Sequence, residues 1–165
     1  GSPRLTSYAL VQWQTHAMAI AMMLGAGIGN DDVMRVLSSL NLLTLWTPEY
    51  FLANVSTGDL PGFLAEAGMG SSEQNAYDYL SQLRAMMAHD VFAHDPEEGP
   101  GYADSLKADV LVVNFASDQM VNPAPGRALA ESVKQEYAEI ETICGHMGTT
   151  CESDRVVRLV HDFLE

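Results

Sequence analysis

The sequence predicts an α/β fold in which a helical region, residues 1–95, precedes a β-α-β-α segment, residues 96–165, with parallel strands. Three observations lead to this prediction. Apolar residues in the first region recur every three or four positions, which is the period of a helix. The second region carries two short strand-like runs, each followed by a helical pattern. Between the two regions, residues 95–101 form the densest cluster of turn-forming residues in the chain, so the boundary is placed there.

Four helices are expected in the first region, separated by glycines and prolines that act as breakers. They span Tyr8–Leu24, Asn30–Leu40, Pro48–Val55 and Ser72–His89. Asn30 or Asp31 is expected to cap the second helix, and Ser71 and Ser72 are expected to cap the fourth. The first region is therefore predicted to be helical throughout.

A buried parallel strand is expected where the run Asp-Val-Leu-Val-Val-Asn-Phe-Ala begins at Asp109, because the run is apolar on both faces. This strand ends at Ser117 and Asp118. A helix over Arg127–Tyr137 and a second strand over Glu139–Cys144 follow. Because the connection between the two strands contains a helix that can cross over the sheet, the strands are expected to be parallel.

The last helix is expected after residues 145–148, which break the second strand. Thr149 and Glu152, three residues later, have the spacing of a capping box, which opens a helix. Apolar residues on this helix recur at spacings of one, three and four, so one face should lie against the sheet. The order strand, loop, helix, strand, loop, helix is typical of α/β architecture.

The acidic charge of the chain excludes several classes of partner. The formal net charge is −14, from 22 acidic against 8 basic side chains, and such a field repels phosphate backbones and anionic lipid surfaces. Nucleic-acid binding is therefore not expected. The longest apolar stretch, Ala17–Ile28, is too short to span a bilayer and no signal peptide is recognisable, so no membrane association is expected. The compartment stays open, with the cytoplasm favoured.

Cysteines and histidines give little indication of a metal or redox centre. The spacing of Cys144 and Cys151 matches no compact zinc or CxxC pattern, so both are expected to be ordinary thiols. His89 and His94 are five residues apart and do not share a helical face. We therefore expect them to lie at the surface or in turns and not to bind a divalent metal ion. No metal and no cofactor are therefore predicted.

Asp118 and His146 are the candidate catalytic residues. Each follows a predicted strand, and loops that leave the carboxyl ends of parallel strands meet at one edge of the sheet, where ligands bind. A neutral imidazole can take a proton from a nucleophile and later give it to a leaving group, while a carboxylate on its other nitrogen fixes the tautomer. The chain order, acid then base, is the order that follows the nucleophile in α/β-hydrolases. The pair is therefore predicted to be the acid and base of a catalytic triad.

Three stretches of the sequence resemble the C-terminal half of the homoserine O-acetyltransferase group within the α/β-hydrolase superfamily. They are GSPRLTSYALVQWQ, NAYDYLSQLRAMMAHD, and ADVLVVNFASDQMVNP together with GHMGTTCESDRVVRLVHDFL. The resemblance covers nearly the whole chain. It implies a partial α/β-hydrolase fold in which Asp118 and His146 are triad members. It also implies that residues up to about 94 form a helical lid inserted between core strands, which roofs an acyl pocket.

The resemblance further implies a serine-type acyl hydrolase or O-acyltransferase that acts on a small-molecule acyl ester or an acyl-CoA. Met147 stands where homoserine transferases commonly have an acidic residue after the catalytic histidine, so hydrolysis and acyl transfer are both open. The nucleophile elbow, Gly-x-Ser-x-Gly or a close relative, does not occur in the sequence. The nucleophile is therefore expected before Gly1, and this chain alone is expected to be a catalytically incompetent fragment.

Two further classes of function fit parts of the sequence. A noncatalytic interaction module could oligomerise through apolar helix faces, with Trp13, Trp46, Tyr50 and Phe51 as anchors. A thiol redox protein would need a lowered thiol pKa, and no basic cluster lies near the cysteines to lower it. Because two parallel strands leave apolar faces and strand edges uncovered, a homo-oligomer or an association with a missing N-terminal core is expected.

Overall fold

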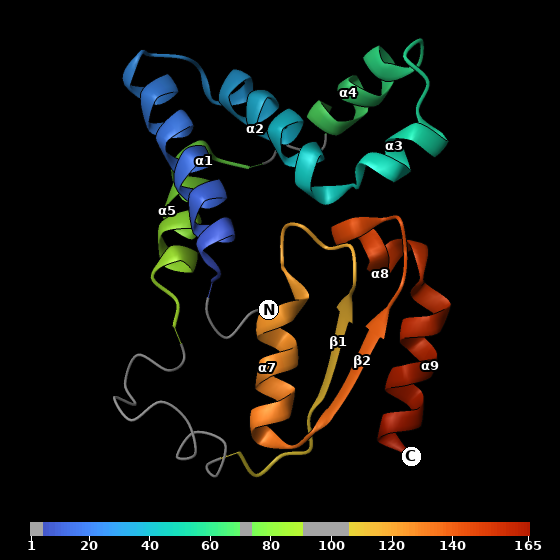
Figure 1. Ribbon diagram of the computed structural model, residues 1–165. Coiled ribbons are helices and arrows are strands. Elements are labelled where there is room, and N and C mark those ends of the chain that lie inside the picture. The colour runs from blue at the N-terminus through green and yellow to red at the C-terminus, as the bar shows by residue number, and fades with distance from the viewer. Residues whose placement is uncertain (1–4, 70–73, 91–105) are drawn as a thin grey trace.

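The structure is a computed structural model that describes residues 5–69, 74–90 and 106–165 (Figure 1). The described helical part contains α1 (Ser7–Gly25), α2 (Asn30–Leu45), α3 (Pro48–Asn54), α4 (Leu60–Met69) and α5 (Ala76–Met87). It is followed by β1 (Leu111–Phe115), α7 (Pro123–Val133), β2 (Glu136–Ile140), the 3-10 turn η1 (Gly145–Met147), α8 (Gly148–Cys151) and α9 (Ser153–Leu164). Both strands point their carboxyl ends toward the helical part, as Figure 1 shows.

The helical part has a core of its own. Helix α1 begins after Thr6, whose hydroxyl accepts a hydrogen bond from the Ala9 amide at 3.2 Å and so caps the helix. The buried face of α1 meets α2 and α5. The buried core consists of Ala9, Trp13, Ile20, Val33, Met34, Leu37, Ala76, Leu80, Leu83 and Met120. Met120 belongs to the loop after β1, so this core reaches into the part of the chain that carries Asp118.

The expected helices of the first region are present where the structure describes them, but one of them, α2, is longer than predicted and one further helix, α4, was not predicted. Helix α2 runs to Leu45 and not to Leu40, because Leu42 continues its buried face. Helix α4 was not predicted, since its start, Leu-Pro-Gly-Phe, contains both residue types that usually break helices. None of the helices within the described ranges combines the length and the apolar character that a bilayer span requires.

Some of the sequence predictions fall outside the described residues. They are the cap at Ser71 and Ser72, the boundary at residues 95–101, and His94. The predicted start of the fourth helix at Ser72 is wrong, because residues 74 and 75 are not helical. Within the described residues, α5 begins at Ala76 and is capped by Asn75, whose Oδ1 accepts a hydrogen bond from the next residue but one. The position of the boundary therefore stays a prediction.

Asn30 connects two helices and does not cap its own. The residue before α2 is Gly29, which makes no side-chain cap, so the predicted cap at Asn30 or Asp31 is wrong. The side chain of Asn30 turns instead to the start of α5: Oδ1 accepts from the Ala76 amide at 2.8 Å, and Nδ2 donates to the Gln74 carbonyl at 3.1 Å. Asn30 therefore satisfies one of the free amides at the start of a neighbouring helix.

Strands β1 and β2 pair in parallel, as predicted, and their register runs from Leu111 opposite Glu136 to Phe115 opposite Ile140. Helix α7 contacts both strands, and α9 contacts β1. The two helices lie on either side of the strands in Figure 1. This arrangement places the loops after β1 and β2 next to each other, below the helical part.

The second strand begins earlier than predicted. The helix before it ends at Val133 and not at Tyr137, because Lys134 takes a left-handed conformation with a φ of 55° that stops the helix. Tyr137 then lies in the strand, which covers Glu136–Ile140 and not Glu139–Cys144. Over so short a stretch, periodicity alone does not separate a helix end from a strand start, and no glycine marks this helix end.

The predicted capping box before the last helix is wrong, but the predicted packing of that helix is confirmed. Thr149 lies inside α8, and α9 begins at Ser153 after Glu152, which makes no side-chain cap. Helix α9 lies against β1, as expected. Its half-buried apolar residues are Val156, Leu159 and Phe163, and its exposed ones are Val157, Val160 and Leu164. Helix α9 therefore carries more apolar surface than the two strands cover.

Gly148 is a point of close packing between α8 and β1. A Cβ atom at this position would overlap the ring of Phe115, which is buried. We expect Gly148→Ala to lower the free energy of unfolding by about 1–3 kcal/mol, because the ring must leave its packed position. Urea unfolding followed by circular dichroism measures this change.

Gly62→Ala is the matched control for this prediction, because the space around Gly62 in α4 is open. It should change the free energy of unfolding by less than about 1 kcal/mol, in the stabilising direction, since alanine is the better helix former. Equal losses in the two variants would show that the contact with Phe115 does not set the cost.

His16 is a buried, unpaired imidazole in the helical core, on the face of α1 that carries Trp13. No described residue forms a hydrogen bond with its Nδ1. Burial lowers the pKa of His16 below its ordinary value of 6.5, because the charged imidazolium would lose its hydration. The folded protein therefore favours the neutral ring.

The free energy of unfolding should fall on acidification because of His16. Above pH 6.5 the ring is neutral in both states and adds no pH dependence. Below this pH the unfolded chain binds a proton that the folded chain does not, so stability is lost until the pH reaches the lowered pKa. Urea unfolding between about pH 5 and about pH 7.5 should show this slope. It should disappear in His16→Leu and remain in the control His161→Gln, whose side chain is exposed; a slope that survives His16→Leu belongs to other groups.

Candidate active site

Asp118 is held by the turn that follows β1. Its amide donates to the Phe115 carbonyl at 3.1 Å, which closes the turn. Its Oδ1 accepts hydrogen bonds from the amides of Met120 at 2.9 Å and Val121 at 2.8 Å. The side chain is only 7% exposed. Two amide donors therefore fix a buried carboxylate in one orientation and leave Oδ2 for another partner.

His146 lies in η1, after β2, and is that partner. Its Nδ1 is 2.9 Å from Oδ2 of Asp118. Because an ionised carboxylate only accepts hydrogen bonds, Nδ1 carries the proton and Nε2 is left as an acceptor. The His146 side chain is 34% exposed, and no described residue forms a hydrogen bond with Nε2. The structure thus brings together the two residues that the sequence indicated, with a free nitrogen facing outward from the pair.

A groove of about 410 Å³ opens beside the pair. Its lining contains Asp118, His146 and every residue of β1, together with Val121 and Leu129. Within the described part of the chain β1 pairs with β2 alone. All residues of β1 but none of β2 line the groove, so the groove follows the free edge of β1. The pair therefore lines a groove beside β1 to which polar and apolar surface contribute in similar amounts.

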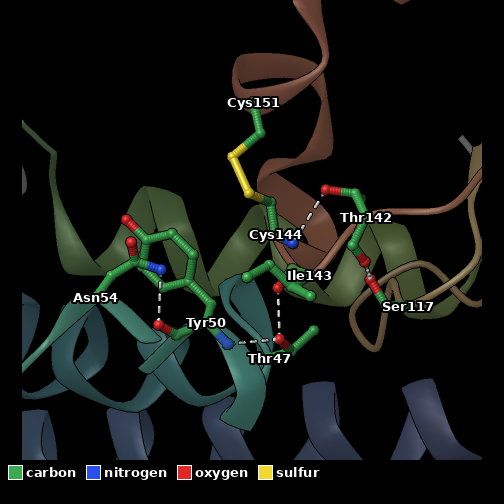
Figure 2. The surroundings of a disulfide bond; sticks show 8 residues. All are labelled: Thr47, Tyr50, Asn54, Ser117, Thr142, Ile143, Cys144 and Cys151. Atoms are coloured by element: carbon green, nitrogen blue, oxygen red, sulfur yellow. Dashed lines mark hydrogen bonds between the residues drawn. A yellow bond between two sulfur atoms is a disulfide. The ribbon is translucent and has the colours of Figure 1, made fainter. Parts of the chain in front are cut away.

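The helical part contacts the loop after β2 at the corner between α2 and α3. Thr47 is 2% exposed there, and its hydroxyl donates to the Ile143 carbonyl while it accepts from the Tyr50 amide at 3.1 Å (Figure 2). Gly145 takes a φ of 60°, and a Cβ atom at this position would lie 3.0 Å from the Leu45 carbonyl oxygen. Thr47 therefore caps α3 and holds the neighbouring loop with one hydroxyl.

The loop that carries Asp118 has two anchors of its own. Met120, whose amide binds the Asp118 carboxylate, is buried in the core of the helical part together with Trp13. Ser117 donates to the Thr142 carbonyl at 2.6 Å, which joins the loop after β1 directly to the loop after β2 (Figure 2). Sequence reasoning did not indicate Thr47, Met120 or Ser117, because their roles rest on contacts between distant parts of the chain.

Cys144 and Cys151 form a disulfide, which corrects the expectation of two ordinary thiols (Figure 2). The bond joins the residue before η1 to the last residue of α8, so it encloses His146. Two compact turns, η1 and α8, bring the two Cα atoms to 6.5 Å, a distance that the sequence spacing could not give. Cys144 is buried, whereas Cys151 is exposed.

The disulfide should stabilise the folded chain. In the chain-entropy account, a cross-link that closes a loop of this size contributes about 2–3 kcal/mol. We expect reduction with dithiothreitol to lower the free energy of unfolding by that amount, as measured by urea unfolding. The double variant Cys144→Ala/Cys151→Ala should have the lower value and should not respond to dithiothreitol. Equal stability of the oxidised and reduced wild-type protein would contradict this expectation.

The described residues contain no group of three or more histidine, cysteine, aspartate or glutamate side chains that could hold a metal ion. One charged cluster lies outside the site, between α7 and β2. Arg127 is 2.5 Å from Glu139, and the Tyr137 hydroxyl donates to the same carboxylate. The hydrogen bond from Tyr137 and the one from Arg127 lower the pKa of Glu139. This cluster ties a helix to a strand and lies on exposed surface, so it is a structural contact.

Comparison with known proteins identifies the fold. Neither a protein-family model nor a curated protein matches the sequence. The solved homoserine O-acetyltransferase from Bacillus anthracis matches with a TM-score of 0.83 at 15% identity, over 99% of this chain and 51% of that chain. The acetyl esterase MekB gives 0.80 at 16% identity, over 99% and 51%. An acetylester hydrolase from Corynebacterium glutamicum gives 0.73 at 20% identity, over 90% and 46%.

The chain therefore has a partial α/β-hydrolase fold, in which helices precede a segment with parallel strands. This confirms the predicted fold class, and the resemblance to homoserine O-acetyltransferases holds at the level of the fold. The solved structures that share it include esterases and acetyltransferases. The chain spans about half the length of these structures, and identities of 20% or less establish the fold without the activity.

Proposed function

We propose that this chain supplies the acid and the base of an acyl-transfer site, with Asp118 orienting His146 and His146 moving the proton. The observation that carries the proposal is the 2.9 Å contact between Asp118 Oδ2 and His146 Nδ1, after two adjacent parallel strands. Ligands of open α/β sheets bind at the carboxyl ends of such strands. The fold is shared with esterases and acetyltransferases, which supports acyl chemistry at this edge.

In the proposed mechanism each proton transfer involves a named atom. Nε2 of His146 takes the proton of an attacking hydroxyl while the hydroxyl oxygen bonds to the acyl carbon. The resulting imidazolium is stabilised by Oδ2 of Asp118, whose other oxygen is held by two amides. Nε2 then gives the proton to the leaving oxygen or sulfur as the bond to the acyl carbon breaks. A second round with water gives hydrolysis, and a second round with another hydroxyl gives acyl transfer.

The nucleophile of the proposed site lies outside these 165 residues. Gly-x-Ser-x-Gly does not occur in the sequence, and the matching structures are about twice as long as this chain. The groove along the free edge of β1 supports a further strand at that position. So does the apolar stripe of α9, formed by Val157, Val160 and Leu164, which is exposed. In this proposal residues 1–95 are the lid and residues 96–165 are the C-terminal part of the core.

The substrate class in this proposal is a small-molecule acyl ester or an acyl-CoA. Support comes from the position of the helical part, which stands over the carboxyl ends of β1 and β2 in Figure 1, where a lid would enclose an acyl group. Val121 and Leu129 give the groove beside His146 apolar surface that could contact an acyl chain, next to the polar groups of the pair. Water and a hydroxyl acceptor are both compatible with Met147 after the histidine, so hydrolase and transferase share this description.

A noncatalytic oligomerising module is the alternative, and the structure accounts for its anchors in another way. Trp13 is 4% exposed and belongs to the helical core, so it is not available to a partner. Trp46 and Tyr50 stack with ring centroids 3.9 Å apart. Phe51 packs edge to face on Tyr50 and on Phe63. These aromatic contacts join α3 to α4, so packing explains them without an interface.

Asp118→Asn and His146→Ala test the proposed roles in the longer polypeptide that contains the nucleophile. Each should lower kcat for p-nitrophenyl acetate by about 10⁴-fold, since the base is lost or held in the wrong tautomer. Asparagine is chosen because its side-chain oxygen can still accept the two amide hydrogen bonds. His161→Gln is the matched control on exposed surface and should keep the wild-type rate.

The 165-residue chain alone provides the second arm of this test. Its turnover of p-nitrophenyl acetate should not exceed that of its own His146→Ala variant, because no nucleophile is present. Turnover that His146→Ala abolishes in this chain would place the nucleophile within it. Wild-type rates in the longer His146→Ala variant would overturn the acid and base assignment itself.

A further inference from the structure

His146 sits in a short element that cannot fix its position alone. The turn η1 has three residues and no side-chain cap. The hydrogen bond from Nδ1 to Asp118 orients the ring but does not hold the backbone that carries it. A misplacement of about 1 Å in a catalytic group can cost about 100-fold in rate. The backbone around η1 must therefore be held by contacts from elsewhere in the fold.

The disulfide holds this backbone from one side. Cys144 precedes η1 directly, and its sulfur is bonded to Cys151 at the end of α8, just before α9 packs on β1. The amide of Cys144 donates to Oγ1 of Thr142 at 3.2 Å, which further restrains the chain as it leaves β2 (Figure 2). The disulfide thus joins the two ends of the segment that carries His146, and this segment lies between β2 and α9 in the chain.

Thr47 holds the same backbone from the other side. Its hydroxyl binds the Ile143 carbonyl, one residue before the disulfide, and its side chain is nearly inaccessible to solvent. A Cβ atom on Gly145 would lie 3.3 Å from Cγ2 of Thr47, so the loop and the corner between α2 and α3 are in direct contact. Figure 2 shows Thr47 and Cys144 on opposite sides of Ile143.

We infer that Thr47 and the Cys144–Cys151 disulfide, together called the loop clamp, are positioning elements for His146. The loop clamp fixes residues 143–145, and His146 follows directly, so Nδ1 is kept within hydrogen-bond reach of Asp118. This inference rests on the proposed function of His146 as the base. Because Thr47 belongs to the helical part, that part would align the site as well as cover it.

The test measures His146 and not activity, so it uses the 165-residue chain as it is. In the ¹⁵N-labelled oxidised protein, NMR should show the Nδ1 proton of His146 protected from exchange with solvent. Opening of the loop exposes this proton, so its exchange rate reports how firmly the loop is held. We expect reduction with dithiothreitol, and separately Thr47→Val, to raise this rate by about tenfold or more. Thr47→Ser retains the hydroxyl and should behave like the wild type.

The reduction is a defined reaction of the two cysteines. A dithiothreitol thiolate attacks the exposed Cys151 sulfur, and Cys144 leaves as a thiolate. The second dithiothreitol thiol then displaces Cys151, so the products are two protein thiols and the cyclic disulfide of dithiothreitol. His146 itself is not altered in this step, so any change in its exchange comes from the loop or from the lower stability of the reduced chain.

Two controls separate positioning from general loss of stability. Thr6→Val removes the side-chain cap of α1, as Thr47→Val removes that of α3. Thr6 is not part of the loop clamp, so the His146 proton of Thr6→Val should exchange as in the wild type. Reduction also lowers the free energy of unfolding, so amide exchange in α1 serves as the reference for this general loss of stability. The His146 proton should accelerate more than the α1 amides do, and an equal rise throughout the chain would show stabilisation only and would overturn the inference. If Thr47→Val does not fold, reduction of the wild type decides alone.

Asp118→Asn distinguishes failure of this inference from failure of the proposed function. It should remove the protected Nδ1 proton in the oxidised chain, because the asparagine oxygen stays on the two amides and its NH2 group then donates to Nδ1. If it does so while reduction and Thr47→Val change nothing, the Asp118–His146 pair stands and the loop clamp is wrong. If the His146 proton is unaffected by Asp118→Asn, the pair does not act as proposed, whatever the loop clamp does.

Discussion

The parallel pairing of β1 with β2 is the constraint on which the candidate site depends. Phe115 lies opposite Ile140 at the ends of the two strands, so both following loops leave the sheet at the same edge. Asp118 and His146, each a few residues beyond its strand, can then meet at 2.9 Å. An antiparallel pair would send the two loops to opposite ends of the sheet. The helix α7 between the strands makes the parallel arrangement possible.

The helical part stabilises both of these loops. It buries Met120, whose amide binds the Asp118 carboxylate, and it provides Thr47, whose hydroxyl binds the loop of His146. Each functional side chain therefore depends on a contact from helices that are remote in sequence. Packing in the core of the helices and alignment of the Asp118–His146 pair are coupled, because Met120 takes part in both.

The sequence was sufficient for the features that depend on neighbouring residues. The run after Asp109 predicted a strand, although β1 is less buried than expected, and Asp118 and His146 were predicted because each follows a strand. What it could not predict depends on the folded path of the chain. Thr47 and Ile143 are 96 residues apart, and nothing local to either indicates their hydrogen bond. The disulfide is a similar case, since cysteines seven positions apart can form a bridge only if the chain turns back.

Helix ends were a different source of error, because a single residue can decide them. Lys134 stops α7 in a left-handed conformation that glycine more often adopts, so the sequence carried no sign of it. The early end of the helix moves β2 toward the start of the chain and leaves the stretch from Glu141 to Cys144 as a loop. That loop is long enough to reach Thr47, so the mistaken boundary concealed a functional contact.

In the proposed function, the exposed apolar surface and the nucleophile that the chain lacks have the same origin. Four of the five residues of β1 are only half-buried, although the strand is apolar on both faces and is of the kind that a complete sheet encloses. His146 and the residues of β1 line the same groove, and a stripe of apolar residues on α9 is also exposed. A further strand in this groove would bury that surface, and the loop leaving its carboxyl end would approach Nε2 of His146. The same additional strand would therefore complete both the hydrophobic core and the proposed triad.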